Sequence, residues 1–255
     1  MGTLGFLRML WRVTFILTLT IILCICRLLL WPGVWISPAA DRRVRRFLLQ
    51  TWNRGFAWAV NIQIHTHGPV PKPPFFLVSN HLSYLDMVVL THQTGCIYVS
   101  RGDVEHWPII GFLARSLYII FVDRKNIRDT VRVNRLIADA LALGDAVVIF
   151  PESHITVGKE VEPFKSSLIE PAVAARIPVH YATLTYETLP ECPPASEIVN
   201  WWRPESFLYH LQRLMRHRGV KATIHFGESP LYGEDRKELA PRLHEAVQAA
   251  YTPIV

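Results

Sequence analysis

Two residues that could transfer a proton follow the apolar run Phe75 to Ser79. They are His81 and Asp86, and on one continuous helix their side chains would point roughly 140° apart. If His81 lies in the turn before a helix, Asp86 can accept a hydrogen bond from one imidazole nitrogen and leave the other free to take a proton from a hydroxyl group. The stretch therefore indicates a general base and the group that orients it.

The same stretch has a second interpretation. Ser83 is followed three residues later by Asp86, which resembles the spacing of a capping box at a helix N-terminus. Asp86 would then serve the helix backbone, and His81 would be an ordinary loop residue. On this stretch alone, capping and catalysis stay equally open.

A carboxylate follows a second apolar run, Ala146 to Phe150. Glu152 stands in the stretch Phe150-Pro151-Glu152-Ser153-His154. Because ligand-binding and catalytic groups gather at the carboxyl ends of strands in open α/β sheets, we expect Glu152 at the same sheet edge as His81. Glu152 could hydrogen-bond a substrate hydroxyl or shape its loop, and the alternative is a helix-capping or solvated glutamate.

Three cations stand where they could hold an anionic head group. Arg124 and Lys125 follow the run Ile119 to Val122, and Lys165 stands at the start of an expected helix. Arginine binds phosphate through two parallel hydrogen bonds, whereas lysine acts as a point charge. A solvated strand end is the alternative for the first two residues.

These side chains need a scaffold that brings strand ends together. Short β-rich runs are expected at residues 62–65, 75–79, 97–99, 119–122, 146–150, 179–185 and 220–226. Helices are expected at residues 84–90, 108–117, 127–143, 164–175, 206–217 and 235–251. The alternation predicts an α/β domain over residues 61–255, with a mostly parallel central sheet flanked by helices.

The first 40 residues differ in composition from the rest. Val13 to Cys26 has no charged residue and Leu28 to Ile36 continues the apolar run, so the stretch reaches the roughly 20 residues that a bilayer span needs. Arg27 interrupts it, at a cost of at least ~2.5 kcal/mol unless its side chain snorkels. We predict a membrane-anchoring helix over residues 1–40, which either spans the bilayer or is bent, tilted or interfacial. A cleaved signal peptide is the competing interpretation.

A basic segment follows this apolar one. The arginines at 42, 43, 45 and 46 precede apolar residues at near-helical spacing, which predicts an amphipathic helix over residues 41–60. We expect these arginines to rest on anionic lipid head groups. The alternative is an ordinary surface helix whose arginines are solvated.

Composition restricts the classes of function. Of the 255 residues, 50% are apolar and 19% are charged, which excludes intrinsic disorder. The net charge of +6 suits nucleic acid, an anionic lipid surface or an anionic substrate, and charge alone does not choose among them. The four cysteines fit neither a disulfide framework nor a metal pattern, and His65 with His67 lacks further ligands at readable spacing. There is no glycine-rich nucleotide loop and no G-x-S-x-G nucleophile elbow, and we predict no metal, no cofactor and no nucleic-acid partner.

Four short motifs, taken in order, resemble those of one known family. Its NHxxxxD motif is similar to Asn80-His81 through Asp86, its second motif to Phe121 with Arg124, its third to Phe150-Pro151-Glu152 and its fourth to Ile177-Pro178-Val179. The family is that of the glycerolipid acyltransferases of the 1-acylglycerol-3-phosphate acyltransferase (PlsC) type. The resemblance extends from about residue 61 to residue 186 and includes Phe164-Lys165.

The resemblance implies roles for residues of this chain. His81 is expected to be the general base and Asp86 the residue that orients it. Arg124 is the expected ligand of a head-group phosphate, and Glu152 is expected to bind the acceptor. The full set of expected substrate-binding residues is Asn80, Arg124, Lys125, Glu152 and Lys165.

The resemblance also implies a membrane-bound O-acyltransferase. We expect it to move a fatty acyl group from acyl-CoA or acyl carrier protein to a lysolipid, with 1-acyl-sn-glycerol 3-phosphate as the first choice and phosphatidic acid as the product. Because the donor is already activated, the reaction needs no further cofactor. The catalytic domain is expected to face the cytoplasm from the inner or cytoplasmic membrane.

Two departures from the family pattern keep other functions open. Tyr118 stands where the second motif has glycine, and Ser153-His154-Ile155 replaces the Gly-Thr-Arg that commonly follows the third glutamate. The lost arginine removes an expected phosphate contact. One alternative acceptor is therefore a lyso-aminolipid of the lyso-ornithine type. The other alternative is a non-catalytic lipid-binding or membrane-shaping protein on the same fold, although such a protein has no need of an oriented base.

Overall fold

The computed structural model describes residues 3–30, 37–102, 119–122 and 127–254. Within them lies a seven-stranded sheet in the order β1-β7-β6-β2-β5-β3-β4. Its strands are β1 (Ile62–His67), β2 (Phe75–Ser79), β3 (Ile97–Arg101), β4 (Ile120–Val122), β5 (Ala146–Ile149), β6 (Val179–Thr188) and β7 (Val220–Phe226). Neighbouring strands run parallel except β6 and β7, which are antiparallel. The predicted α/β fold with a mostly parallel sheet is confirmed.

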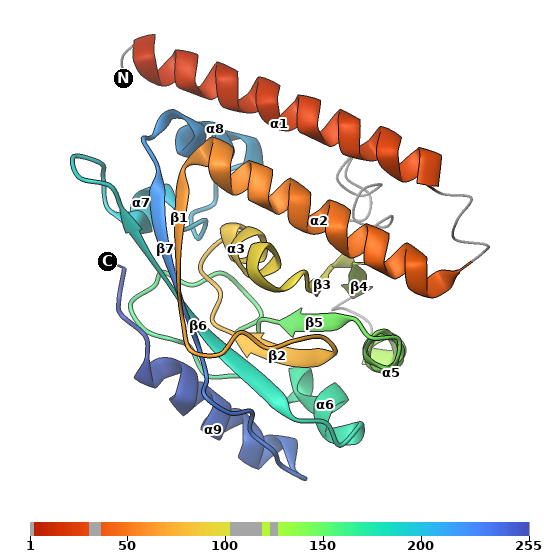
Figure 1. The fold of residues 1–255 in the computed structure, drawn as a ribbon. Helices are drawn as coiled ribbons and strands as arrows, with labels where there is room; N and C mark the ends of the chain where they lie inside the picture. Colours follow the sequence, from red (N-terminus) through yellow and green to blue (C-terminus); the bar gives the residue numbers. More distant parts are fainter. Residues whose placement is uncertain (1–2, 31–36, 103–118, 123–126, 255) are drawn as a thin grey trace.

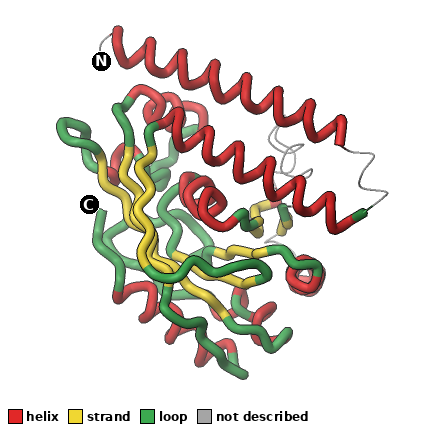
Figure 2. The backbone as a smooth tube through the Cα atoms, in the orientation of Figure 1, coloured by secondary structure: helices red, strands yellow, loops and turns green. Residues whose placement is uncertain are grey.

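Helices cover both faces of this sheet. On one face α3 (Leu85–Thr94) lies beneath α2 (Pro38–Val60), and on the opposite face lie α6 (Glu170–Ala174) and α9 (Arg236–Ala249) (Figure 1). Figure 2 shows the same three layers, with the strands between two sets of helices. The remaining described helices are α1 (Thr3–Leu30), α5 (Ile127–Ala142), the 3-10 turn η3 (Ser166–Leu168), α7 (Ala195–Ile198) and α8 (Phe207–Arg216).

The central strands explain where the site forms. Every residue of β2 and β5 is buried, as expected for apolar runs in a sheet that is covered on both faces. The two strands are parallel neighbours with Val78 paired to Ile149, so they end side by side. The polar residues that follow them therefore leave the core at one edge, as predicted.

Some helices differ from the expectation. The stretch 164–175, predicted as one helix, forms η3 and then the short α6, because Pro171 stands in the first turn of α6 and proline starts a helix better than it continues one. The helix predicted at 108–117 lies outside the described residues. The four-residue helix α7 follows Pro194 and was not predicted.

Helix α1 lies along α2 and α8 (Figure 1). Arg12 donates hydrogen bonds to the carbonyl oxygens of Met215 and His217, at 3.0 and 2.7 Å, and Arg8 donates to that of Arg216 at 2.9 Å. The last turn of a helix leaves carbonyl groups unpaired and carries partial negative charge. The two arginines of α1 therefore cap the C-terminal end of α8.

The other end of α1 is tied to the start of α2. Arg27 forms an ion pair with Asp41, which also accepts a hydrogen bond from Arg45 at 3.1 Å. All three side chains are buried. Helix α1 thus continues unbroken through Arg27, whose charge faces the protein rather than lipid.

The arginines at the start of α2 do not share one environment. Arg45 is buried against Asp41, so the prediction that it rests on lipid is wrong. Arg46 donates to the carbonyl oxygen of Gly144 at 2.6 Å, which leaves Arg43 as the exposed member of the predicted set. The division into residues 1–40, 41–60 and 61–255 stays a prediction.

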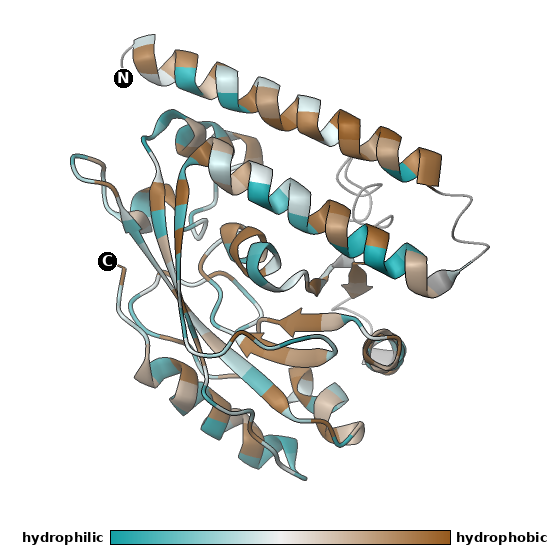
Figure 3. Cartoon of the chain, in the orientation of Figure 1, coloured by the Kyte–Doolittle hydropathy of each residue, from teal (hydrophilic) through white to brown (hydrophobic). Residues whose placement is uncertain are grey.

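The outward face of α1 is apolar (Figure 3). Its exposed side chains include Leu4, Leu17, Ile21, Leu28 and Leu29. Among the described helices, α1 is the one long and apolar enough to cross a membrane by length and composition. An exposed apolar surface of this kind marks a site that contacts a membrane or another protein.

Candidate active site

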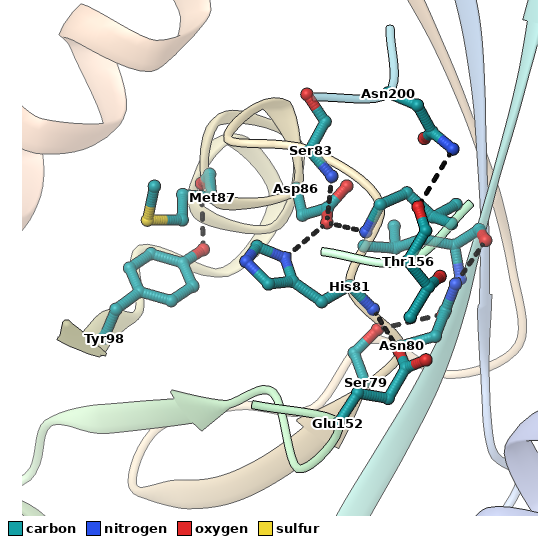
Figure 4. Close-up of polar contacts among 12 residues, drawn as sticks. Ser79, Asn80, His81, Ser83, Asp86, Met87, Tyr98, Glu152, Thr156 and Asn200 are labelled. Atoms are coloured by element: carbon teal, nitrogen blue, oxygen red, sulfur yellow. Dashed lines mark hydrogen bonds and ion pairs between the residues drawn. The ribbon is translucent and has the colours of Figure 1, made fainter. Parts of the chain in front are cut away.

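His81 lies in the turn between β2 and α3, as predicted, and Asp86 lies in the first turn of α3. Nδ1 of His81 and Oδ2 of Asp86 are 2.8 Å apart (Figure 4). Because an ionised carboxylate can only accept hydrogen bonds, Nδ1 is the donor, and in the neutral imidazole Nε2 carries the lone pair. Among the residues that the structure describes, Nε2 has no hydrogen-bond partner, and the side chain is partly exposed.

Asp86 also serves the backbone at the start of α3. Its Oδ2 accepts hydrogen bonds from the N–H groups of Leu82 and Ser83, at 2.7 and 2.9 Å. The capping and catalytic interpretations of the sequence are therefore compatible, since one carboxylate does both. The side chain of Asp86 is fully buried, so these donors and the positive end of α3 replace the water that would otherwise solvate its charge.

Aromatic rings hold the imidazole of His81 from one side. The rings of His81 and Phe150 stack with centroids 4.1 Å apart and planes 12° apart. Phe150 stacks in turn on Tyr98, whose hydroxyl donates to the carbonyl oxygen of Met87 at 2.8 Å. The stack restricts rotation of the imidazole and thereby fixes the direction of Nε2.

Glu152 lies at the predicted edge, but its carboxylate binds backbone groups. Oε1 accepts from the N–H of His81 at 2.6 Å and Oε2 from that of Glu162 at 2.9 Å. Burial raises the pKa of Glu152 to about 8, and the two backbone hydrogen bonds act in the opposite direction. The side chain is 1% exposed, so its contacts support the loop-shaping role, and a substrate contact stays a prediction.

Asn80 is likewise used inside the fold. Its Oδ1 accepts from the N–H of Leu184 at 2.7 Å, and its Nδ2 donates to the carbonyl oxygen of Leu184 at 2.9 Å. The amide thereby extends the pairing of β2 with β6 by one residue. Because Asn80 is buried and both amide atoms have partners, its predicted substrate contact is disfavoured and stays a prediction.

The predicted cations are only partly covered by the structure. Arg124 and Lys125 lie outside the described residues. Lys165 is exposed and its ammonium contacts the hydroxyl of Ser153. Ser153 has a φ of 66°, in the left-handed region that favours glycine, so this serine keeps the backbone conformation that suits the family's glycine at a cost in strain.

One residue of the site was not found from the sequence. Tyr186, on β6, is fully buried and its hydroxyl donates to Oδ1 of Asp86 at 2.7 Å. The sequence placed residue 186 just beyond a strand, where it reads as an ordinary core aromatic. The available signal was that a buried tyrosine hydroxyl needs a hydrogen-bond partner.

A chain of hydrogen bonds supports the His81 turn from the far side. The N–H of Thr156 donates to the carbonyl oxygen of His81 at 3.1 Å, and the side-chain amide of Asn200 donates to that of Thr156 at 3.2 Å. The carbonyl oxygen of Asn200 accepts from Nε2 of His210, whose Nδ1 accepts from the hydroxyl of Tyr84. The loop before α8 and the start of α3 are thus bonded to one another around the site.

The mostly parallel seven-stranded sheet with its flanking helices is the fold of the PlsC-type acyltransferases. Residues 61–184 match the family described as Acyltransferase. This match, together with the relatives described next, confirms the resemblance noted in the motifs of the chain.

Relatives with two different acceptors are similar to this chain. The lyso-ornithine lipid O-acyltransferase of Rhizobium meliloti is 28% identical over 241 residues, which is 89% of this chain and 82% of the relative. The 1-acyl-sn-glycerol-3-phosphate acyltransferase of Neisseria meningitidis is 27% identical over 135 residues, which is 52% of this chain and 53% of the relative.

A solved structure has the same fold. The 1-acyl-sn-glycerophosphate acyltransferase PlsC of Thermotoga maritima superimposes with a TM-score of 0.64, over 93% of this chain and 95% of that chain, at 15% identity. Because the superposition covers 93% of this chain, it extends beyond residues 61–255 into the N-terminal helices.

Proposed function

We propose that this chain transfers a fatty acyl group from a thioester to the hydroxyl group of a lysolipid. The observation that carries the proposal is the 2.8 Å contact between Nδ1 of His81 and Oδ2 of Asp86 at the end of a buried strand. It leaves Nε2 oriented and able to accept a proton. The match of residues 61–184 to the Acyltransferase family supports the transfer of an acyl group.

The proposed reaction needs no covalent intermediate on the protein. His81 Nε2 takes the proton of the acceptor hydroxyl while the hydroxyl oxygen bonds to the thioester carbonyl carbon. The tetrahedral intermediate then breaks its carbon–sulfur bond, and the leaving thiolate takes the proton back from Nε2. The products are an ester and a thiol, and His81 is neutral again. The donor is acyl-CoA or acyl carrier protein.

The acceptor that we favour is a lyso-ornithine lipid. Relatives of that name from Rhizobium meliloti, Pseudomonas aeruginosa and Brucella abortus each align with at least 80% of this chain and 82% of their own length. The 1-acyl-sn-glycerol-3-phosphate acyltransferases of Neisseria meningitidis and Homo sapiens align with about half of it. Ile155, in place of the third-motif arginine, also favours a head group without phosphate.

Lysophosphatidic acid is the second candidate acceptor. Lys165 lies exposed beside Ser153, close in sequence to Glu152 and the His81 edge, and could contact a phosphate. Arg124 and Lys125 would complete an anionic head-group site. In both cases Asn80 and Glu152 act by holding the backbone of the catalytic turn.

The membrane arrangement that we favour has α1 lying along the bilayer surface with its apolar face in lipid. Arg12 bonds the inner side of α1 to the end of α8, and Arg27 bonds it to the start of α2, which packs on α3. A helix tied down in this way cannot cross the bilayer while the domain stays on one side. The α/β domain then faces the cytoplasm, where thioester donors are available.

The decisive experiment is acyl transfer by the full-length protein in phospholipid vesicles. Labelled acyl-CoA and acyl carrier protein are each offered with lyso-ornithine lipid, lysophosphatidic acid and other lysolipids, and products are resolved by mass spectrometry. We expect O-acylation of lyso-ornithine lipid to be fastest. Faster turnover of lysophosphatidic acid would favour the second candidate, and no product with any acceptor would favour a non-catalytic lipid-binding protein.

A further inference from the structure

Tyr186 is a buried ionisable residue that the proposed reaction does not use directly. It stands on β6, a hundred residues along the chain from Asp86, and only 1% of the residue is exposed to solvent. Its hydroxyl donates to Oδ1 of Asp86 at 2.7 Å. Burial raises the pKa of Tyr186 well above its usual range, so the phenol stays protonated and remains a donor wherever the enzyme is folded.

The two oxygen atoms of Asp86 have different partners. Oδ2 accepts from Nδ1 of His81 and from the backbone N–H groups of Leu82 and Ser83. Among the described residues, Tyr186 is the one hydrogen-bond partner of Oδ1. The carboxylate is therefore fixed in its plane from both sides: the turn holds one oxygen and β6 holds the other.

Hydrogen bonds to a carboxylate favour its ionised form, whereas burial disfavours it. Without the Tyr186 hydroxyl, Oδ1 would lie in the interior with no donor, and the carboxylate would be a stronger base. It would then attract the Nδ1 proton of His81 more strongly and stabilise the imidazolium form. The proton affinity of Nε2 would rise in consequence.

We propose that Tyr186 is a positioning residue of the catalytic pair, which holds Asp86 as an ionised acceptor and so sets the basicity and direction of His81. Its role is indirect, because it touches Asp86 and not the imidazole. Three other titratable groups lie close enough to Asp86 for its negative charge to raise their pKa values: Glu152, Tyr98 and Tyr251. None of these donates to Oδ1, so none can replace Tyr186 in this role.

The test compares Tyr186→Phe with Tyr251→Phe in the full-length protein. Both changes remove one buried hydroxyl, but the hydroxyl of Tyr251 donates to the carbonyl oxygen of Gly158 and not to Asp86. We expect Tyr186→Phe to lower kcat about tenfold with little change in KM. The acid limb of its profile of kcat/KM against pH should move to higher pH, by about half a pH unit or more. In Tyr251→Phe the acid limb should stay where it is in the parent protein.

A purely structural role for Tyr186 would lower the stability and activity of Tyr186→Phe without moving its acid limb. An unchanged acid limb in a folded Tyr186→Phe protein therefore overturns the proposal. If that variant does not fold, a fluorinated tyrosine introduced at position 186 keeps the ring and strengthens the donor. The acid limb should then move downward, and no movement would again contradict the proposal.

This inference rests on the proposed function of His81, and a direct measurement separates the two. The imidazole of His81 can be titrated by NMR in isotopically labelled protein without any substrate. We expect its pKa to be higher in Tyr186→Phe than in the parent protein. If His81→Ala is fully active, the proposed function is wrong. If His81→Ala is inactive but the titration of His81 is the same in Tyr186→Phe as in the parent protein, only the inference about Tyr186 is wrong.

Discussion

The turn that carries His81 and the outward face of α1 are opposites in how they are stabilised. In the turn, the carboxylates of Asp86 and Glu152 accept from backbone N–H groups on one side and from side chains on another, at distances of 2.6 to 2.9 Å. On α1, the outward side chains are apolar and exposed, with Leu4 at 78% and Leu29 at 75%. The polar groups of the turn find their hydrogen-bond partners within the protein, whereas the apolar face of α1 is exposed and marks a surface that contacts lipid or another protein.

The difference shows that the geometry of the catalytic turn and the attachment of the protein to a membrane depend on separate forces. Hydrogen bonds inside the protein set the geometry of the turn, whereas burial of apolar area in lipid would hold α1 at a membrane. The regions meet at α8, because Arg12 of α1 caps its C-terminal end and His210, near its start, accepts from Tyr84 beside the catalytic turn. Each region can therefore be changed with the other as reference.

The largest effect is expected from a change in the turn that leaves α1 untouched. His81→Ala removes the base and should lower acyl transfer by about 10²–10⁴-fold. Because the side chain is partly exposed and makes no contact with α1, the variant should stay folded and bind vesicles as the parent protein does, with a lower unfolding temperature because the buried Asp86 loses one donor. Turnover, vesicle flotation and thermal unfolding are measured on one preparation. Activity within a few-fold of the parent would remove the mechanism.

The next largest effect is expected from a change that removes the ion pair between α1 and α2. Asp41→Ala removes the buried carboxylate that Arg27 and Arg45 contact, and loss of one partner of a buried ion pair costs at most about 3–5 kcal/mol. The matched control is Asp139→Ala, whose partner Arg135 lies 4.0 Å away on the exposed face of α5. An exposed pair contributes about 0–1 kcal/mol. Thermal unfolding in detergent should show a large loss for the first variant and almost none for the second.

A third change concerns the apolar face of α1. Ile21 is 59% exposed, and Ile21→Asp should weaken binding to vesicles by about 10- to 100-fold, since burying such a side chain is worth about 1.5–3 kcal/mol. Val131 on α5 is 74% exposed and is not part of this face, so Val131→Asp is the control. Equal vesicle binding by the two variants would show that α1 is not the surface that meets lipid.

The smallest effect is a pH dependence that belongs to the turn. Burial, and then the charge of Arg213, lower the pKa of His210 to about 4, against about 6.5 in an unfolded chain. Between these values the unfolded chain binds a proton that the folded chain does not, so stability falls as pH decreases from 6.5 to 4. The contribution of His210 to this slope is at most about 1.4 kcal/mol per pH unit. His210→Gln should flatten it, while above pH 7.5 the variant and parent curves should run parallel.

The sequence predicted the elements that depend on local patterns. Apolar runs located the strands of the sheet, and the spacing of His81 and Asp86 required His81 to precede α3, as the structure has it. The approach of Glu152 to the same edge followed from the strand ends alone. These features depend on periodicity and chain direction, which a sequence displays directly.

Other features depend on contacts between distant segments, which a sequence does not display. Arg27 read as an interruption of an apolar run, because its partner Asp41 becomes visible only when two helices pack together. Tyr186 read as a core aromatic, because its bond to Asp86 joins residues a hundred positions apart. The amide of Asn80 resembled a substrate ligand until the path of β6 placed Leu184 beside it.

Much of the hydrogen bonding around the two carboxylates comes from the main chain, with Leu82, Ser83, His81 and Glu162 as N–H donors. A main-chain donor is supplied by every amino acid except proline, so the shape of the site is largely indifferent to which side chains stand at positions 82, 83 and 162. These hydrogen bonds therefore set no requirement on the side chains at those positions, and the requirement that remains at Leu82 is burial in the core. Ser83→Ala should be silent in an activity screen, whereas Ser83→Pro should be lost from it.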